Sequence, residues 1–396
     1  MPRSHRFRWL PALALAAAAS VVLSSTAVAD ASPPHRLVSN YETHSGNSLQ
    51  RDCGFSHTLP NDSDSSIWLF CDTPTANSSG KVIGFITGST AALGPITAGK
   101  VPTGLSEIPS QGTDIEPLPS YQGPQQFLPA PSLVTLPGSS TDCALDPGHH
   151  YPATWMSGVT REPSSANASR LLISFTDVCV DADSSQTITS ERFGLAEYDP
   201  ADNTVVKFTR VFKSAAGTNL APVLLLGSPV FSGGELYLFS FTCDQQDGFG
   251  GCTRGRVFLA RTGATPSSWE QASSYQFRKP SSPSGWTSDP NAAESIITGA
   301  MAVGVTADSY SSLGQGLDLI EETNVFSGKF RVWSASSPVG PWTQKTSGQV
   351  PCKSGSGTLN FCRALIGHPE LSTSTDLLLS FFDPGTNHVW VTAQAW

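Results

Sequence analysis

The 396-residue sequence predicts an all-β protein, a five-bladed β-propeller, from three observations. First, charged residues make up only 14% of the chain and Ser, Thr, Gly and Pro are frequent, which favours an extracellular β protein. Second, one strand-like apolar run occurs five times, at residues 67–73, 171–177, 236–242, 317–322 and 377–383. Third, these runs start 104, 65, 81 and 60 residues apart, which excludes a strict repeat and fits blades with unequal loops.

The other strands of each blade are placed around these runs. The segments at 51–56 and 67–73 flank the turn-forming cluster Asn61–Ser65 and predict a hairpin, with a third strand at 81–87. Blade two begins at 151–159. Blade four begins near 293–297, and blade five opens at 365–371. The C-terminal part is one strand short of a four-stranded blade, so we expect the segment at 36–41 to complete it and close the ring.

Two further segments interrupt or precede the blades. Residues 97–150 are rich in Pro, Gly and Ser without periodicity, so we expect a long loop insertion in a single domain at 30–396. Residues 1–29 carry three arginines, an apolar run and Ala-Val-Ala, the layout of a signal peptide. We therefore expect a secreted protein with no membrane span.

Charge excludes one class of partner. Without the three arginines of the predicted signal, 20 basic residues face 32 acidic ones, a net charge of −12. Nucleic acid and anionic membranes would require a basic surface, so neither is expected as a partner.

Eight cysteines in an exported chain predict four disulfides. Cys53 and Cys71 lie at equal distance from the turn at Asp62, and Cys243 and Cys252 flank Asp247-Gly248 in the same way. A local loop would pair Cys352 with Cys362, which leaves Cys143 with Cys179. The absence of Cys-x-x-Cys removes support for zinc ribbons and thioredoxin-type redox sites.

Several segments resemble a known group of proteins. They are Arg51-Asp52, Trp68–Thr73, Tyr151–Val159, Ser337–Trp342 and His368–Leu371. The chain is similar to five-bladed propellers of glycoside hydrolase family 43. It is more closely similar to the bacterial domain of unknown function 4185 family, some members of which are endo-D-arabinanases. The resemblance implies a glycoside hydrolase acting on arabinan-type furanosides, although the acids of family 43 are absent from the first three inner strands.

Inner strands of a propeller line a central channel, so their polar residues are the site candidates. Glycoside hydrolysis requires one carboxyl as acid and another as nucleophile or base, and the expected catalytic residues are Asp52, Glu294 and Glu370. Each has a simpler explanation: an ion pair of Asp52 with Arg51, a solvated strand start at Glu294, and a blade-junction acceptor at Glu370.

Arg51, Trp155 and His368 are the expected substrate-binding residues. Trp155 offers a ring for stacking on sugar, or a core residue. His368 either joins two strands or, as the resemblance implies, lies near a central ion or water. No dedicated metal site or cofactor is expected, although a structural calcium or other ion in the channel is compatible with the resemblance.

The sequence thus predicts a monomeric, secreted, glycan-active propeller whose partner is a polysaccharide or oligosaccharide. Two alternatives remain: a lectin-like propeller that binds glycan without cleaving it, and an interaction scaffold at the cell surface.

Overall fold

The computed structural model describes residues 33–396 except 113–117, 132, 147, 164–168, 184–186 and 354–360. The predicted signal peptide lies outside these residues. No described helix is long and apolar enough to cross a bilayer.

Five antiparallel sheets of four or five strands follow one another along the chain. From the innermost strand outward, the first contains β3 (Cys53–Leu59), β4 (Asp62–Phe70), β7 (Thr90–Pro95) and β8 (Ser106–Glu107); the second β9 (His150–Arg161), β10 (Leu171–Asp181), β11 (Thr187–Asp199) and β12 (Thr204–Lys213); the third β13 (Gly227–Ser232), β14 (Glu235–Gln246), β15 (Cys252–Gly263), β16 (Gln276–Arg278) and β17 (Trp286–Thr287). In the same order, the fourth contains β18 (Gly304–Ser309), β19 (Leu317–Asn324), β20 (Lys329–Ala335) and β21 (Thr343–Gln349); the fifth β22 (Arg363–Gly367), β23 (Asp376–Asp383), β24 (His388–Ala395) and β1 (His35–Arg36).

Short elements complete the described chain. A small sheet holds β2 (Ser48–Leu49), β5 (Thr73–Ala76) and β6 (Val82–Ile86), and the helical turns are α1 (Asn40–Ser45), α2 (Pro266–Trp269), η1 (Pro222–Leu224), η2 (Ala272–Ser274), η3 (Pro290–Ala292) and η4 (Ser311–Leu313).

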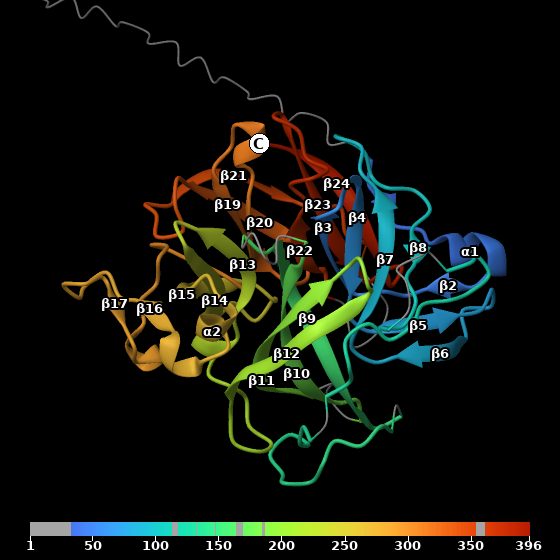
Figure 1. The fold of residues 1–396 in the computed structure, drawn as a ribbon, viewed down its shortest axis with the longest axis horizontal. Coiled ribbons are helices and arrows are strands. Elements are labelled where there is room, and N and C mark those ends of the chain that lie inside the picture. Colours follow the sequence, from blue (N-terminus) through green and yellow to red (C-terminus); the bar gives the residue numbers. More distant parts are fainter. Residues whose placement is uncertain are drawn as a thin grey trace, which may run out of the picture. The chain divides into compact units, whose positions relative to one another are not determined.

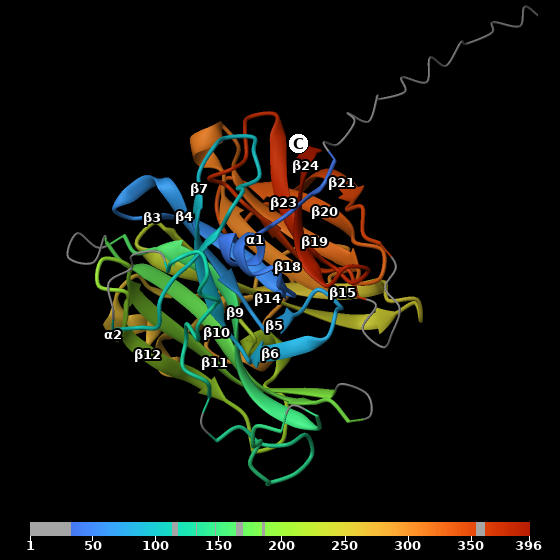
Figure 2. The same cartoon turned by 90° about the vertical axis from the view of Figure 1, so that its right-hand side faces the viewer.

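The inner strands form a closed ring. β3 contacts β9, β9 contacts β13, β13 contacts β18, β18 contacts β22, and β22 contacts β3. In both views the blue sheet of β3 and β4 lies beside the red sheet of β23 and β24 (Figure 1 and Figure 2). This confirms the predicted propeller.

Each pair of neighbouring sheets encloses one apolar core, and five such clusters follow the ring. The second strand of a sheet therefore packs on both faces, and β19 is buried from Leu317 to Thr323. A strand buried on both faces is apolar throughout rather than alternating. The five recurring runs of the sequence are these second strands: β4, β10, β14, β19 and β23.

The ring is closed by the N-terminal segment. His35 pairs with Val391 and Arg36 with Trp390, so β1 is the outermost strand of the fifth sheet. This confirms the predicted closure, but the strand is shorter than the expected 36–41, because it ends at Arg36 and helix α1 begins at Asn40.

Two predicted strand assignments are wrong. The segment at 81–87 falls on β6 of the small sheet, and β7 pairs with β4 in its place. The segment at 293–297 is a loop whose Ile297 fills the core between the third and fourth sheets, while β18 is the true inner strand. β18 reads Gly-Val-Thr-Ala-Asp-Ser, small and polar because it lines the channel, and its sequence signal is weak.

The insertion at 97–150 packs over the first two sheets where it is described. Its strand β8 extends the first sheet, and Phe127 and Leu128 are buried in the core shared with the second sheet. Cys143 joins it to β10 through Cys179.

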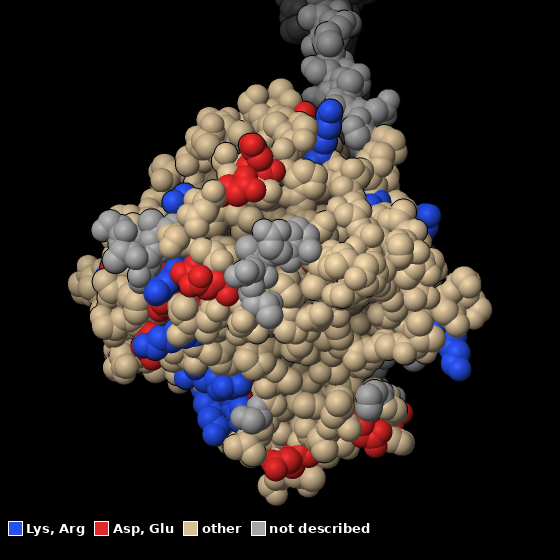
Figure 3. All heavy atoms as spheres, turned by 45° about the vertical axis from the view of Figure 1, so that its right-hand side comes forward, with Lys and Arg blue, Asp and Glu red and all other residues tan. Residues whose placement is uncertain are grey.

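All four expected disulfides are present: Cys53–Cys71, Cys143–Cys179, Cys243–Cys252 and Cys352–Cys362. Four such bonds are typical of proteins from oxidising compartments. The face in Figure 3 is largely uncharged, with charges of both signs in small separate groups.

Candidate functional site

The ring of inner strands encloses a narrow channel with a mouth at either end. The channel itself holds only about 20 Å³ and is lined by residues of all five inner strands, including Phe55, Gly158 and Ser228. The wide mouth, of about 910 Å³, opens where β3, β13, β18 and β22 begin, at Cys53, Gly227, Gly304 and Arg363. The narrow mouth, of about 300 Å³, opens near the opposite ends of the same strands, at Thr58, Arg161, Phe231, Ser309 and Glu370.

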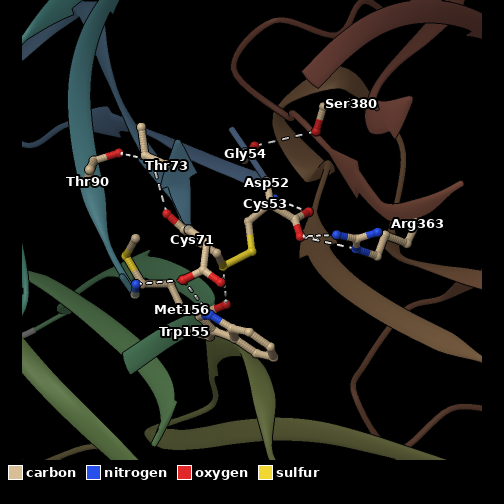
Figure 4. The surroundings of a disulfide bond; sticks show 12 residues. Asp52, Cys53, Gly54, Cys71, Thr73, Thr90, Trp155, Met156, Arg363 and Ser380 are labelled. Carbon is tan, nitrogen blue, oxygen red and sulfur yellow. Dashed lines mark hydrogen bonds and ion pairs between the residues drawn. A yellow bond between two sulfur atoms is a disulfide. The ribbon is translucent and has the colours of Figure 1, made fainter. Parts of the chain in front are cut away.

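Asp52 lies directly before β3, next to two residues that line the wide mouth, Cys53 and Arg363, and is ion-paired with this arginine of the fifth sheet. Its Oδ2 accepts hydrogen bonds from Arg363 Nη2 at 2.6 Å and Nε at 3.1 Å, and its Oδ1 accepts one from the backbone N–H of Cys53 at 2.7 Å (Figure 4). Two bonds from one guanidinium to the same carboxylate oxygen fix the orientation of the Asp52 side chain. The sequence suggested Arg51 as the ion-pair partner, and the structure has Arg363 instead.

Glu322 reaches the same mouth from β19. It lies opposite Gly304, where a Cβ atom would come within 2.8 Å of its Oε2, so the glycine makes room for the carboxyl. The residue is only 4% exposed, and burial raises the pKa of Glu322 to about 8, with Arg363 lowering it and Asp52 raising it further. A carboxyl with this pKa is largely protonated at neutral pH.

Two polar atoms at this mouth have no hydrogen-bond partner among the described residues: Glu322 Oε1 and Arg363 Nη1. The neighbouring Glu321 differs, since its Oε2 accepts from Arg331 Nε at 2.8 Å and from Trp333 Nε1 at 2.7 Å. Buried polar atoms are rarely left unsatisfied, and exceptions need an explanation. Glu321 holds β19 to β20, whereas Glu322 Oε1 and Arg363 Nη1 are buried without such a partner.

A third carboxyl, Asp72, lies behind Asp52. Its backbone oxygen accepts from Asp52 N at 3.3 Å, and its side chain accepts from Trp155 Nε1 at 3.0 Å and Tyr151 Oη at 2.8 Å. Burial raises the pKa of Asp72 to about 6. This carboxyl fixes the indole of Trp155, one of the expected substrate-binding residues, beside the Cys53–Cys71 disulfide (Figure 4).

The inner strands are bent at this mouth. Cys53, Ser228 and Ala364 have positive φ of 65°, 49° and 58°, and each adjoins a register shift in its sheet. Non-glycine residues adopt this region at a cost and are enriched at functional sites, where bulges redirect side chains. The bends set the direction of Asp52, before Cys53, and Arg363, before Ala364.

Arg51 is buried and does not reach either mouth. It forms an ion pair with Glu107 of β8 and lies 4.3 Å over the ring of Phe70. Its partners are those of a residue that holds the first sheet together.

Glu370 and His368 meet near the narrow mouth, away from Asp52. Ser56 bridges them, bonding His368 Nδ1 at 2.6 Å and donating to Glu370 Oε1. Burial lowers the pKa of His368 to about 3 and raises that of Glu370 to about 6. The contacts join β3 to the loop after β22, as the strand-joining alternative for His368 expects.

Asp308, at the end of β18, also lines the narrow mouth. Burial raises its pKa to about 8, and the nearby Glu370 raises it further. Within the described part of the chain, no three His, Cys, Asp or Glu side chains gather as a metal-binding group.

Glu294 lies apart from both mouths. It follows η3 in the loop before β18, and its carboxylate accepts a hydrogen bond from Ser281 N at 3.0 Å and another from the Ser281 hydroxyl. These hydrogen bonds lower its pKa. The sequence predicted an inner strand at 293–297, but this segment is a loop. The structure therefore does not bring Asp52, Glu294 and Glu370 together.

Sequence reasoning missed Glu322, Arg363 and Asp72. Glu321-Glu322 was visible as two acids within an apolar run, a pattern that predicts buried carboxyls. The sequence does not show which glutamate bonds Arg331 and Trp333 of β20, because this depends on how β19 and β20 pair in the folded sheet.

The buried carboxyls make the free energy of unfolding fall as pH rises from about 4 to about 8. The folded protein keeps the protons of Glu322 and Asp308 up to about pH 8, whereas the unfolded chain releases them near pH 4. Stability gained from these groups is therefore complete at low pH and is lost as pH rises toward 8. The lowered pKa of His368 has the opposite effect: it makes the free energy of unfolding fall as pH drops below about 6.5.

We expect the free energy of unfolding to fall between pH 6.5 and 8, with Glu322 alone contributing about 2 kcal/mol. Urea titrations at the two pH values measure it, and Glu322→Gln should remove that share. Equal stability at both pH values would contradict the expectation.

Comparisons with known proteins agree with the fold. The chain matches no family model and no curated protein, so the relation to the domain of unknown function 4185 family stays a prediction. Among solved structures, a proposed hydrolase from Bacteroides ovatus has a TM-score of 0.53 at 16% identity, over 87% of this chain and 85% of that one.

Two further solved structures have lower scores. A family 43 β-xylosidase/α-arabinofuranosidase from a compost microbial metagenome, crystallised with xylotriose, has 0.40 at 10% identity over 92% and 94% of the two chains. A family 117 glycoside hydrolase from Zobellia galactanivorans has 0.37 at 8% identity over 91% and 89%. At 16% identity, the likeness to the Bacteroides ovatus structure extends to the fold and not to the activity.

Proposed function

We propose that the protein is a secreted glycoside hydrolase in which Glu322 is the general acid and Asp52 the nucleophile or base. One observation carries the proposal: Glu322, a buried carboxyl with a pKa of about 8, lines the wide mouth together with Arg363, and Arg363 is ion-paired with a second carboxylate, Asp52. Glycosidases need this division, because one carboxyl must hold a proton for the leaving oxygen while the other is ionised.

The arginine between the two carboxyls has a defined part in this chemistry. Arg363 holds Asp52 through two bonds, and its buried Nη1 has no partner among the described residues. Asp52 is then oriented before substrate arrives. Preorganised groups of this kind act without reorganising during the reaction.

The substrate class follows from the resemblance and the composition. We infer an extracellular or cell-wall polysaccharide, with arabinan-type furanosides favoured. The signal-like N-terminus and the four disulfides support export. A lectin-like propeller would use the same mouth for binding without cleavage.

Incubation with a polysaccharide panel that includes arabinogalactan tests the proposal. The native protein and Glu294→Gln should release oligosaccharide, because Glu294 is bonded to Ser281 outside both mouths, and Asp52→Asn should release almost none. Release by all three would refute the role of Asp52. Binding of a polysaccharide by the native protein without any release would favour the lectin-like alternative.

A further inference from the structure

The wall of the wide mouth is unusually apolar for a sugar site. Its lining includes Phe239 and Phe241 of β14, Val303 just before β18, Val305 on β18, and Phe326 and Phe361 at the rim. The charged residues of the lining are Glu322 and Arg363, and Asp52 adjoins them through its ion pair with Arg363. The mouth is therefore amphipathic, with a small charged group in a largely apolar wall.

The rim of the wide mouth consists of two phenylalanine rings held in place by a neighbouring hairpin. The rings of Phe326 and Phe361 are stacked with centroids 5.3 Å apart and an interplanar angle of 14°. The β14–β15 hairpin supports them, since Val325 N donates to Gly250 O at 2.9 Å, and a Cβ on Gly250 would lie 2.2 Å from the Phe326 ring. Phe326 is nevertheless 46% exposed.

A chain of sugars alone does not match this wall. Every hydroxyl placed against Val305 or Phe241 would lose its bonds to water without replacement, at a cost for each. Hydrocarbon placed there would instead be removed from water favourably. The volume of about 910 Å³ is near the upper end for pockets that enclose a whole small ligand.

We propose that the wide mouth binds a glycoside carrying a hydrocarbon chain, with the sugar at Asp52 and Glu322 and the chain along the apolar wall toward Phe326. This inference rests on the proposed function, because it places the scissile sugar at the carboxyl pair. It narrows the substrate to glycans bearing an alkyl or acyl group.

Calorimetric binding of methyl, butyl and octyl arabinofuranosides, below their micelle-forming concentrations, measures the chain's contribution. The Asp52→Asn, Glu322→Gln double variant is included so that turnover does not interfere. Each methylene buried against the wall should tighten binding about fourfold, so octyl should exceed butyl by up to about 200-fold.

Three variants locate the chain. Val305→Thr keeps the side-chain volume and adds a hydroxyl to the wall, and Phe326→Ser removes half of the stacked rim; both should flatten the dependence on chain length. Phe249→Ser is the matched control, because Phe249 lies on the same hairpin, is 79% exposed and does not line the mouth. It should bind as the native protein does.

The outcomes separate the two proposals. A dissociation constant independent of chain length overturns the inference, even if polysaccharide is cleaved. Octanol that binds as tightly as octyl arabinofuranoside also overturns it, because the sugar then contributes nothing. A clear chain-length dependence with no hydrolysis of any glycoside supports the amphipathic site and refutes the catalytic proposal alone.

Discussion

Glu322→Gln should lower kcat on a cleavable glycan by about 10² to 10⁴-fold, the usual contribution of a positioned general acid. Gln has the same shape but no proton to give to the leaving oxygen. The loss should be smallest for substrates with an acidic leaving group, such as a nitrophenyl glycoside, since these leave without protonation. Initial rates on both substrate types, at pH values from 5 to 8, measure the effect.

The adjacent glutamate provides the control. Glu321→Gln breaks the ion pair with Arg331, so it should lower stability while each folded molecule keeps its activity. Glu322→Gln should be at least as stable as the native protein at pH 8, because it removes a carboxyl that burial keeps from ionising. Full activity of Glu322→Gln would exclude the residue as the acid.

Gly158→Ala should destabilise the protein by about 3 kcal/mol through backbone strain and overpacking. Gly158 lies on the inner strand β9 with φ of 155°, and a Cβ atom there would come within 2.6 Å of the backbone N of Ser228 on β13. Neighbouring inner strands approach so closely at this point that only hydrogen fits. The urea midpoint measures the loss.

Gly84→Ala is the matched control for this substitution. Gly84 also lies in a strand, β6, but the nearest atom to its Cβ position is 3.7 Å away on Thr75. Its urea midpoint should stay within error of the native value. Equal stability of both variants would mean that the inner strands separate easily at β9 and β13.

The sequence predicted those strands whose burial requires apolar residues on both faces. Second strands such as β10 and β23 are apolar on both faces, and the cysteine spacings were short enough to indicate their partners. Inner strands line a channel and are small and polar, so β18 was overlooked in favour of a more apolar loop.

The expected carboxyls lie apart for a geometric reason. Asp52 precedes the inner strand β3, next to the wide mouth, whereas Glu370 follows the inner strand β22 and lines the narrow mouth. Sequence position does not tell which strand end faces which mouth until the ring direction is known. Glu322 lies on a second strand and reaches the channel only because Gly304 leaves room.

The pairing of β1 with β24 has a consequence for biosynthesis. These hydrogen bonds join a segment near residue 35 to one near residue 391, so the ring cannot close before almost the entire polypeptide has left the ribosome. Long-range pairing of this kind is slow compared with local contacts. The ring of a nascent chain therefore stays open until the segment of β24 has been synthesised.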